Sequence, residues 1–242
     1  MSAPFVHLHV HSEFSILDGA CRIPALVEKA ARLEMPAVSL TDHGSLAGAV
    51  ELYRAAHKQG VKPVIGCEVY VVDDRRAQHK GHAHLTLLAE TNEGYANLIR
   101  LSSLGYLEGY YYRPRVDWEL LERHAKGLVA LSGCLSGRVS RALSEARVRD
   151  AEAELDRLVQ LFGRDSTYVE LQNAGLPVQQ DLVPQLAGLA EKSGLPLVAT
   201  GDVHYLDAAD AASHEALLCI QSGDSLKNPN HWRFETNEFY FK

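Results

Sequence analysis

Apolar and polar positions follow two periods along the chain, and these predict strands and helices in turn. Alternating or continuous apolar runs predict short strands, whereas apolar residues at i, i+3 and i+4 predict amphipathic helices. The predicted strands are 5–10, 37–40, 63–72, 84–89, 128–131, 167–171 and 197–200. The predicted helices are 23–33, 46–59, 96–107, 145–162, 179–193 and 208–221.

This order of elements favours a single α/β unit. About seven strand–helix units follow one another without a break in composition, which favours a parallel αβ barrel or a doubly wound sheet. The length of 242 residues and the apolar fraction of 46% fit one compact domain. In both architectures the working groups lie at the C-terminal ends of the strands, so candidate chemistry is expected there.

Charge and cysteine content narrow the possible functions. The chain carries 24 Lys and Arg against 31 Asp and Glu, a formal net charge of −7. This argues against binding nucleic acid mainly through a broad cationic surface, but not against an enzyme that meets phosphates through metal ions. The four cysteines form no C-x-x-C pair, so neither a disulfide framework nor a zinc ribbon is indicated. Without a leader or a long apolar run, the pattern predicts a soluble, cytoplasmic chain that has no membrane segment.

Metal-ligating residue types recur at the predicted strand ends. Alternation along the first strand puts His7, His9 and His11 on one face. Imidazole, carboxylate and thiolate groups near the ends of other strands suit Zn²⁺ or Mn²⁺, and they exceed what one tetrahedral ion can use. These further residues are His43, Glu68, His84, Cys134, Asp202 and His204. The sequence therefore predicts a site with two or more metal ions.

Each of these residues has a structural alternative when it is taken alone. Asp42, beside His43, could cap a helix by accepting backbone N–H groups. Glu68 could form a surface ion pair, and Cys134 could be a small buried hydrophobe. Independent structural residues have no reason to recur at strand ends, so the joint pattern favours the metal site.

Ordered motifs along the chain resemble those of the PHP (polymerase and histidinol phosphatase) superfamily. They are His9-Val10-His11-Ser12, Thr41-Asp42-His43-Gly44, Gly66-Cys67-Glu68, His84, Ser132-Gly133-Cys134 and Gly201-Asp202-Val203-His204. Further segments are similar, more closely, to the N-terminal PHP domain of bacterial DNA polymerase III alpha subunits. They are residues 11–19 and 105–109, and Trp232-Arg233-Phe234 with Glu238-Phe239-Tyr240.

The resemblance implies an α/β fold, a distorted (β/α)₇ TIM-like barrel with the metal site at the C-terminal ends of the strands. It implies up to three divalent ions, Zn²⁺ and/or Mn²⁺, held by nine ligands. These are His9, His11, Asp18, His43, Glu68, His84, Cys134, Asp202 and His204. His7 stands where many superfamily members have Asp, so we expect it to orient a ligand. His82 is a weaker ligand candidate, because it adjoins a polar loop.

The resemblance further implies metal-dependent phosphodiester hydrolysis, with 3′→5′ exonuclease proofreading during DNA replication as the leading function. Asp18, Glu68 and Asp202 would be catalytic through a metal-activated water. Two alternatives stay open. One is a non-catalytic, metal-stabilised scaffold that supports the polymerase and docks partner subunits, and the other is a phosphomonoesterase of the histidinol-phosphatase type.

Substrate contacts and partners complete these expectations. Tyr112, Arg113 and Arg115 are candidate contacts for a single strand, although aromatic residues here could equally pack against a neighbouring domain. Residues 1–242 are expected to form a single PHP domain, the N-terminal part of a longer replicative polymerase subunit, with a naturally short protein as the alternative. The implied partners are the 3′ end of a DNA primer or single strand, the polymerase domains that follow, and other replicase subunits.

Overall fold

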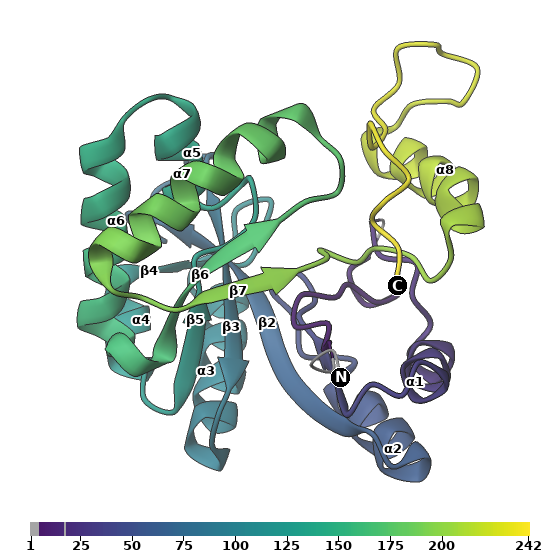
Figure 1. Ribbon diagram of the computed structural model, residues 1–242, viewed down its shortest axis with the longest axis horizontal. Helices are drawn as coiled ribbons and strands as arrows, with labels where there is room; N and C mark the ends of the chain where they lie inside the picture. Colours follow the sequence, from purple (N-terminus) through teal and green to yellow (C-terminus); the bar gives the residue numbers. More distant parts are fainter. Residues whose placement is uncertain (1–4, 17) are drawn as a thin grey trace.

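The computed structural model describes residues 5–16 and 18–242 and has a curled, mixed β-sheet at its centre (Figure 1). The strands lie in the order β1-β2-β3-β5-β6-β7, and β4 pairs with β2. They are β1 (Ala37–Leu40), β2 (Lys62–Val72), β3 (Ala83–Ala89), β4 (Arg115–Asp117), β5 (Leu128–Leu131), β6 (Thr167–Gln172) and β7 (Leu197–Thr200). The predicted α/β barrel is confirmed in the form of a distorted half-barrel.

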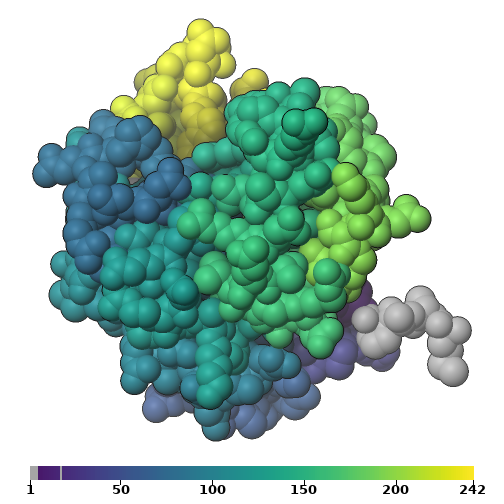
Figure 2. Space-filling model, turned by 90° about the vertical axis from the view of Figure 1, so that its left-hand side faces the viewer, coloured from purple at the N-terminus to yellow at the C-terminus, as the bar shows by residue number. Residues whose placement is uncertain are grey.

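Helices surround this sheet. They are α1 (Ile23–Arg32), α2 (Ala49–Gln59), α3 (Asn92–Leu107), α4 (Trp118–His124), α5 (Arg138–Ser144), α6 (Val148–Phe162), α7 (Pro177–Ser193) and α8 (Ala211–Ser222), with short 3₁₀ turns at Arg164–Ser166 and Ala208–Asp210. Figure 1 shows α4 to α7 at one end of the molecule and α1, α2 and α8 at the other. Figure 2 shows the first of these ends covered by the teal-to-green part of the chain. Among the described residues, no helix combines the length and apolar character needed to cross a bilayer.

The sheet is not parallel throughout, so that part of the prediction is wrong. β3 runs antiparallel to both β2 and β5, whereas the other pairs of neighbouring strands are parallel. The cause is the connection, because the 73–82 loop joins β2 directly to β3 without a crossover helix. As a consequence, the N-terminal end of β3, where His84 lies, faces the same edge as the C-terminal ends of its neighbours.

The N-terminal segment is extended but is not the regular strand predicted at 5–10. The carbonyl oxygens of His7 and Val10 accept hydrogen bonds from Ser39 and Thr41, at and just after β1. On its other side, Val10 forms an isolated parallel bridge with Val203, which follows β7. The segment therefore joins the two edges of the sheet and completes the curl.

Several predicted helix bounds also change. The predicted helix 145–162 is confirmed as α6, which begins later, at Val148, and Ala146, between α5 and α6, has a left-handed φ of 57°. This residue ends α5 without the glycine that usually marks such a break. α3 begins at Asn92, earlier than predicted, because Thr91 caps it by accepting a hydrogen bond from the Gly94 backbone. β4, α4 and α5 were not predicted.

A buried arginine ties the 73–82 loop to the start of α4, and its removal should destabilise the fold. Arg75 Nη1 donates at 2.9 Å to Asp117, and Arg75 Nη2 donates at 2.7 Å to Glu108. We expect Arg75→Met to lower the free energy of unfolding by about 3–5 kcal/mol, because it leaves the buried Asp117 without its counter-charge. Arg76→Met, which removes an exposed ion pair with Glu119, should destabilise the fold far less, because solvent screens such a pair. Urea unfolding of both variants measures the difference, and equal losses would contradict it.

Candidate metal centre

A pocket of about 360 Å³ opens at the edge of the sheet where the strand ends meet. Seven of the nine predicted ligands line it, namely Asp18, His43, Glu68, His84, Cys134, Asp202 and His204. The other two, His9 and His11, are fully buried and reach the same carboxylates from the N-terminal segment. The fold thus places all nine residues around one pocket.

Glu68, on β2, contacts ligand-type groups from several segments. Its Oε2 atom lies 2.7 Å from His43 Nδ1 and 3.0 Å from His84 Nδ1. Its Oε1 atom lies 3.2 Å from His9 Nε2 and 3.6 Å from Cys134 Sγ. The carboxylate is buried, so these contacts lie out of bulk solvent and at the centre of the cluster.

Two aspartates extend the cluster on either side. Asp202 Oδ1 lies 3.4 Å from both His9 Nε2 and His11 Nε2. Asp18 Oδ2 lies 3.1 Å from His43 Nε2. The backbone of Asp202 has a φ of 48°, a left-handed conformation that is uncommon outside Gly, Asn and Asp. Strain of this kind is often held at functional sites, and here it sets the direction of a predicted ligand.

The donor set fits divalent cations. Three overlapping groups each bring three ligand atoms within 4.8 Å of one another, namely His11 with His43 and His204, His9 with His11 and Asp202, and His43 with Glu68 and His84. Five buried atoms of the cluster make no hydrogen bond of good geometry with the described residues, although His43 Nδ1 lies only 2.7 Å from Glu68 Oε2: His9 Nε2, His11 Nε2, Asp18 Oδ1, His43 Nδ1 and Glu68 Oε2. Each such atom costs about 1–3 kcal/mol unless a partner satisfies it. Nitrogen and oxygen donors of this kind are those that Zn²⁺ and Mn²⁺ accept.

Burial and neighbouring charge set the protonation of the cluster. Burial lowers the pKa of His11 to about 3, and the charges of His43 and His204 act in the same direction. For His43, burial opposes the charged form, but Glu68 and Asp18 outweigh it and raise the pKa to about 10. For Asp18, burial opposes ionisation, but its hydrogen bond with His43 outweighs it and lowers the pKa to about 2. His11 is therefore ready to donate a lone pair, whereas His43 must first lose a proton.

Proton competition should make metal affinity depend on pH. A cation that takes His43 displaces its proton, so affinity for Zn²⁺ or Mn²⁺ should rise with pH until about pH 10. In the metal-free chain the contribution of His43 to folding stability has the opposite dependence on pH. The raised pKa stabilises the fold fully below about pH 6.5, and this contribution is lost as the pH rises through about 10.

Titration calorimetry in buffers of different ionisation enthalpy counts the protons released on metal binding. At pH 7 we expect more than one proton, because the pKa values of His43 and His9 are raised and the Cys134 thiol must also lose a proton to bind as a thiolate. His57→Gln changes an exposed histidine on α2 and should leave the count unaltered. A count near zero for the unmodified chain would contradict the prediction.

Residues behind the predicted ligands hold the imidazoles in place. Glu170 Oε1 lies 2.8 Å from His9 Nδ1 and accepts hydrogen bonds from Thr200 Oγ1 at 2.5 Å and Gln172 Nε2 at 3.1 Å. A carboxylate in this position fixes the imidazole ring and raises its basicity as a metal ligand. Glu170 was not singled out from the sequence, where the only signal was a carboxylate within a predicted strand.

Glu170→Gln is therefore expected to weaken metal affinity about 10–100-fold without removing a ligand. Competition with a chromophoric chelator measures this change. Glu191→Gln, on the exposed side of α7, is the matched control and should bind metal like the unmodified chain. An affinity unchanged in Glu170→Gln would show that Glu170 does not support His9.

Asp42 does not cap a helix, so that alternative is wrong. It accepts hydrogen bonds from the Ser12 backbone N–H at 2.7 Å and from the hydroxyls of Ser12 and Ser15 at 2.8 Å. The Ser15 hydroxyl also lies 3.0 Å from His11 Nδ1. Asp42 thus connects the end of β1 to a predicted ligand through Ser15.

Two histidines that the sequence singled out lie outside the cluster. His7 Nε2 lies 2.8 Å from the Lys242 carbonyl oxygen, and its ring packs against Phe241 at 4.2 Å. It joins the N-terminal segment to Phe241 and Lys242, and these contacts do not orient a predicted ligand as expected. The His82 ring stacks on His84 at 5.7 Å, and its Nδ1 lies 3.1 Å from the Lys80 carbonyl oxygen.

The three residues predicted to contact single-stranded DNA occupy two different environments. Tyr112 and Arg113 line a second pocket of about 270 Å³, which shares Asp18 and His43 with the metal pocket. Arg115 is buried, and its guanidinium donates to four backbone carbonyl oxygens. A phosphate contact would break these hydrogen bonds, so Arg115 supports the surrounding loops and only Tyr112 and Arg113 remain candidates.

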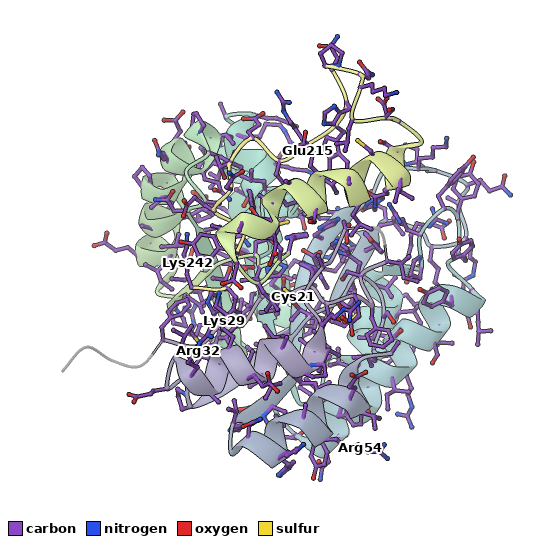
Figure 3. All side chains as sticks on the ribbon, turned by 90° about the vertical axis from the view of Figure 1, so that its right-hand side faces the viewer. Cys21, Lys29, Arg32, Arg54, Glu215 and Lys242 are labelled. Atoms are coloured by element: carbon purple, nitrogen blue, oxygen red, sulfur yellow. The ribbon has the colours of Figure 1, made fainter. Side chains whose placement is uncertain are left out.

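One wall of the metal pocket comes from a segment beyond α8. Trp232, Arg233 and Phe234 line it, although the sequence assigned them no role in the site. Arg233 Nη1 lies 3.9 Å from Glu215 Oε1. Figure 3 shows Glu215 on the side of α8 from which this segment rises. The available signal was a cluster of aromatic residues and arginine after a helix end.

Comparisons with known proteins agree with this geometry. The family model of the PHP domain matches residues 7–174. The chain belongs to the PHP domain family. Over 98% of its length, this PHP domain is 47% identical to the DNA polymerase III subunit alpha of Thermus aquaticus. It is 46% identical to that of Deinococcus radiodurans, also over 98% of its length. These matches confirm the resemblance seen in the motifs.

The PHP domain spans about one fifth of these relatives, 20% of the Thermus protein and 19% of the Deinococcus protein. Its fold is also similar to that of an amidohydrolase from Chromobacterium violaceum, solved with bound sulfate. The TM-score is 0.51 at 18% sequence identity, and the match covers 82% of this chain and 87% of that one. This likeness shows the fold alone.

Proposed function

We propose that this PHP domain is a metal-dependent phosphodiesterase that removes nucleotides from a 3′ DNA end during replication. The observation that supports it is the meeting of imidazole, carboxylate and thiol groups around Glu68, with buried ligand atoms that lack hydrogen-bond partners. Its relatives are alpha subunits of DNA polymerase III, which supports DNA as the substrate. For the same reason we propose that it works in the cytoplasm beside polymerase domains and other replicase subunits.

The nine predicted ligands would hold up to three divalent ions, Zn²⁺ and/or Mn²⁺. When bound, such ions lower the pKa of water and polarise phosphoryl oxygens. Burial opposes ionisation of both Glu68 and Asp202, but neighbouring histidines outweigh it and hold each carboxyl pKa below its usual value. Burial raises the pKa of the Cys134 thiol, so Cys134 must lose a proton before it can act as a thiolate ligand.

Three substrates test the proposal. The chain is incubated with Mn²⁺ or Zn²⁺ and with single-stranded DNA, a primer–template mismatched at its 3′ end, or p-nitrophenyl phosphate. Stepwise shortening from the 3′ end that needs metal and is lost in Asp202→Asn would support the exonuclease. Asn tolerates the left-handed backbone at this position, so the variant should fold. Asp165→Asn changes an exposed residue far from the ligands in sequence and should retain activity.

The other outcomes favour the alternatives. Hydrolysis of p-nitrophenyl phosphate alone would favour a phosphomonoesterase of the histidinol-phosphatase type. A folded, metal-loaded chain that hydrolyses none of the three substrates would overturn the proposed activity. Stabilisation by the metal would then favour the scaffold.

A further inference from the structure

The metal centre lies where two pockets meet. Trp232 forms part of the wall of the first, which has a volume of about 360 Å³, and Tyr112 lines the second, of about 270 Å³. Asp18 and His43 belong to the lining of both. A chain-like molecule that occupies both pockets must therefore cross the ligand cluster.

The Tyr112 pocket offers repeated stacking faces. The rings of Tyr106 and Tyr110 lie nearly parallel, with centroids 6.0 Å apart and an interplanar angle of 15°. The three tyrosines Tyr106, Tyr110 and Tyr112 are 49%, 60% and 62% exposed. Bases of a single strand stack on exposed aromatic rings with little regard to sequence. Several faces in succession suit several consecutive nucleotides.

Arg113 places a positive charge between these tyrosines and the metal centre. Its guanidinium lies 5.8 Å from the centroid of the Tyr70 ring, and that ring stacks on His43 at 5.7 Å. Within the part of the chain that the structure describes, Arg113 forms no salt bridge within 4.0 Å. Its charge is therefore available to a phosphate close to the ligands.

The Trp232 side offers one cation and a smaller aromatic wall. Trp232 is 48% exposed, and its ring lies 6.1 Å from that of Phe234. The side chain of Arg233 is 57% exposed, and its contact with Glu215, at 3.9 Å, is too long for a direct hydrogen bond. One exposed ring with one arginine suits a single nucleotide and its phosphate.

We propose that single-stranded DNA runs along Tyr106 and Tyr110, crosses the ligand cluster, and places its 3′-terminal nucleotide against Trp232 and Arg233. This inference rests on the proposed exonuclease function and adds a direction to it. Water adds its oxygen to the phosphorus of the terminal phosphodiester, and the bond from phosphorus to the upstream 3′ oxygen breaks. That oxygen takes the proton, and a nucleoside 5′-monophosphate leaves from the Trp232 side.

Substrates of different length distinguish the contributions of the two pockets. Steady-state kinetics of the 242-residue chain with Mn²⁺ would compare an oligothymidylate of eight nucleotides with the thymidine dinucleotide. Tyr110→Ala and Arg113→Gln should each raise KM about tenfold for the octamer and at most about twofold for the dinucleotide. Trp232→Ala should raise KM about tenfold for both. The controls Tyr53→Ala and Arg54→Gln change exposed residues on α2 and should leave both values unchanged (Arg54 is labelled in Figure 3).

Binding gives a second measurement that does not need turnover. Fluorescence anisotropy of a labelled octamer with Mn²⁺ should show about tenfold weaker affinity for Tyr110→Ala and Arg113→Gln, and no change for the controls. Equal effects of Tyr110→Ala and Arg113→Gln on the two substrate lengths, or no effect of either, would overturn the proposed direction. If the unmodified chain hydrolyses neither oligonucleotide nor bis(p-nitrophenyl) phosphate, the proposed activity fails, and the binding pattern still decides whether the two pockets hold DNA.

Discussion

Glu68→Gln is expected to lower kcat/KM for metal-dependent DNA hydrolysis by at least about 10³-fold, which is about 4 kcal/mol of lost transition-state stabilisation. Its carboxylate lies within 3.2 Å of ring nitrogens of His9, His43 and His84. An amide keeps the shape but removes the negative charge and one oxygen donor from a site that must hold divalent cations. The substitution therefore affects all the ion positions that share Glu68.

Kinetics and metal content together test this prediction. Measuring bound Mn²⁺ or Zn²⁺ in the same samples distinguishes a loss of the ions from a loss of chemistry with the ions in place. Glu191→Gln makes the same chemical change on an exposed face of α7 and should retain both rate and metal content. Full activity in Glu68→Gln would show that the cluster is not the catalytic centre.

Hydrophobic periodicity predicted most of the strands and helices, because each buries a face with the period of its own backbone. It failed where two different structures share the same pattern of apolar residues. An apolar run such as β3 looks alike whether it pairs parallel or antiparallel, and here the short 73–82 connection decides. The helix α5 was missed, and its end at Ala146 lacked a signal, since a left-handed residue other than glycine carries no local mark.

The candidate site, too, was predicted only in part from the sequence. Motif order predicted ligands that the fold places around one pocket, because residues at the ends of neighbouring strands meet at one edge of the sheet. Arg115 looked equivalent to Arg113, and only the packed loops show that its guanidinium is used by backbone carbonyls. Glu170 contacts His9 from β6 and Trp232 lines the pocket from beyond α8, and such tertiary placements leave no spacing in the sequence.

Removal of divalent ions is expected to lower the Tm of the metal-loaded chain by about 8–16 °C. A ligand present at about 1,000 times its Kd stabilises the native state by about 4 kcal/mol. Each kcal/mol corresponds to about 2–4 °C for a chain of this length. The physical cause is the buried cluster, where atoms such as His11 Nε2 and Asp18 Oδ1 make no hydrogen bond with the described residues. A bound cation would satisfy them, and a chelator would return them to an uncompensated state.

Thermal unfolding with and without a chelator, followed by titration with Mn²⁺ or Zn²⁺, measures this effect. Asp202→Asn should show a smaller loss on chelation, because it binds the ions less tightly from the start. Asp165→Asn should match the unmodified chain. A Tm that stays constant when the ions are removed would show that metal binding does not stabilise the fold. The buried carboxylates and the left-handed backbone at Asp202 would then need another explanation. A large decrease in Tm on chelation, in a chain that hydrolyses no substrate, would instead indicate that the cluster binds metal to stabilise the fold.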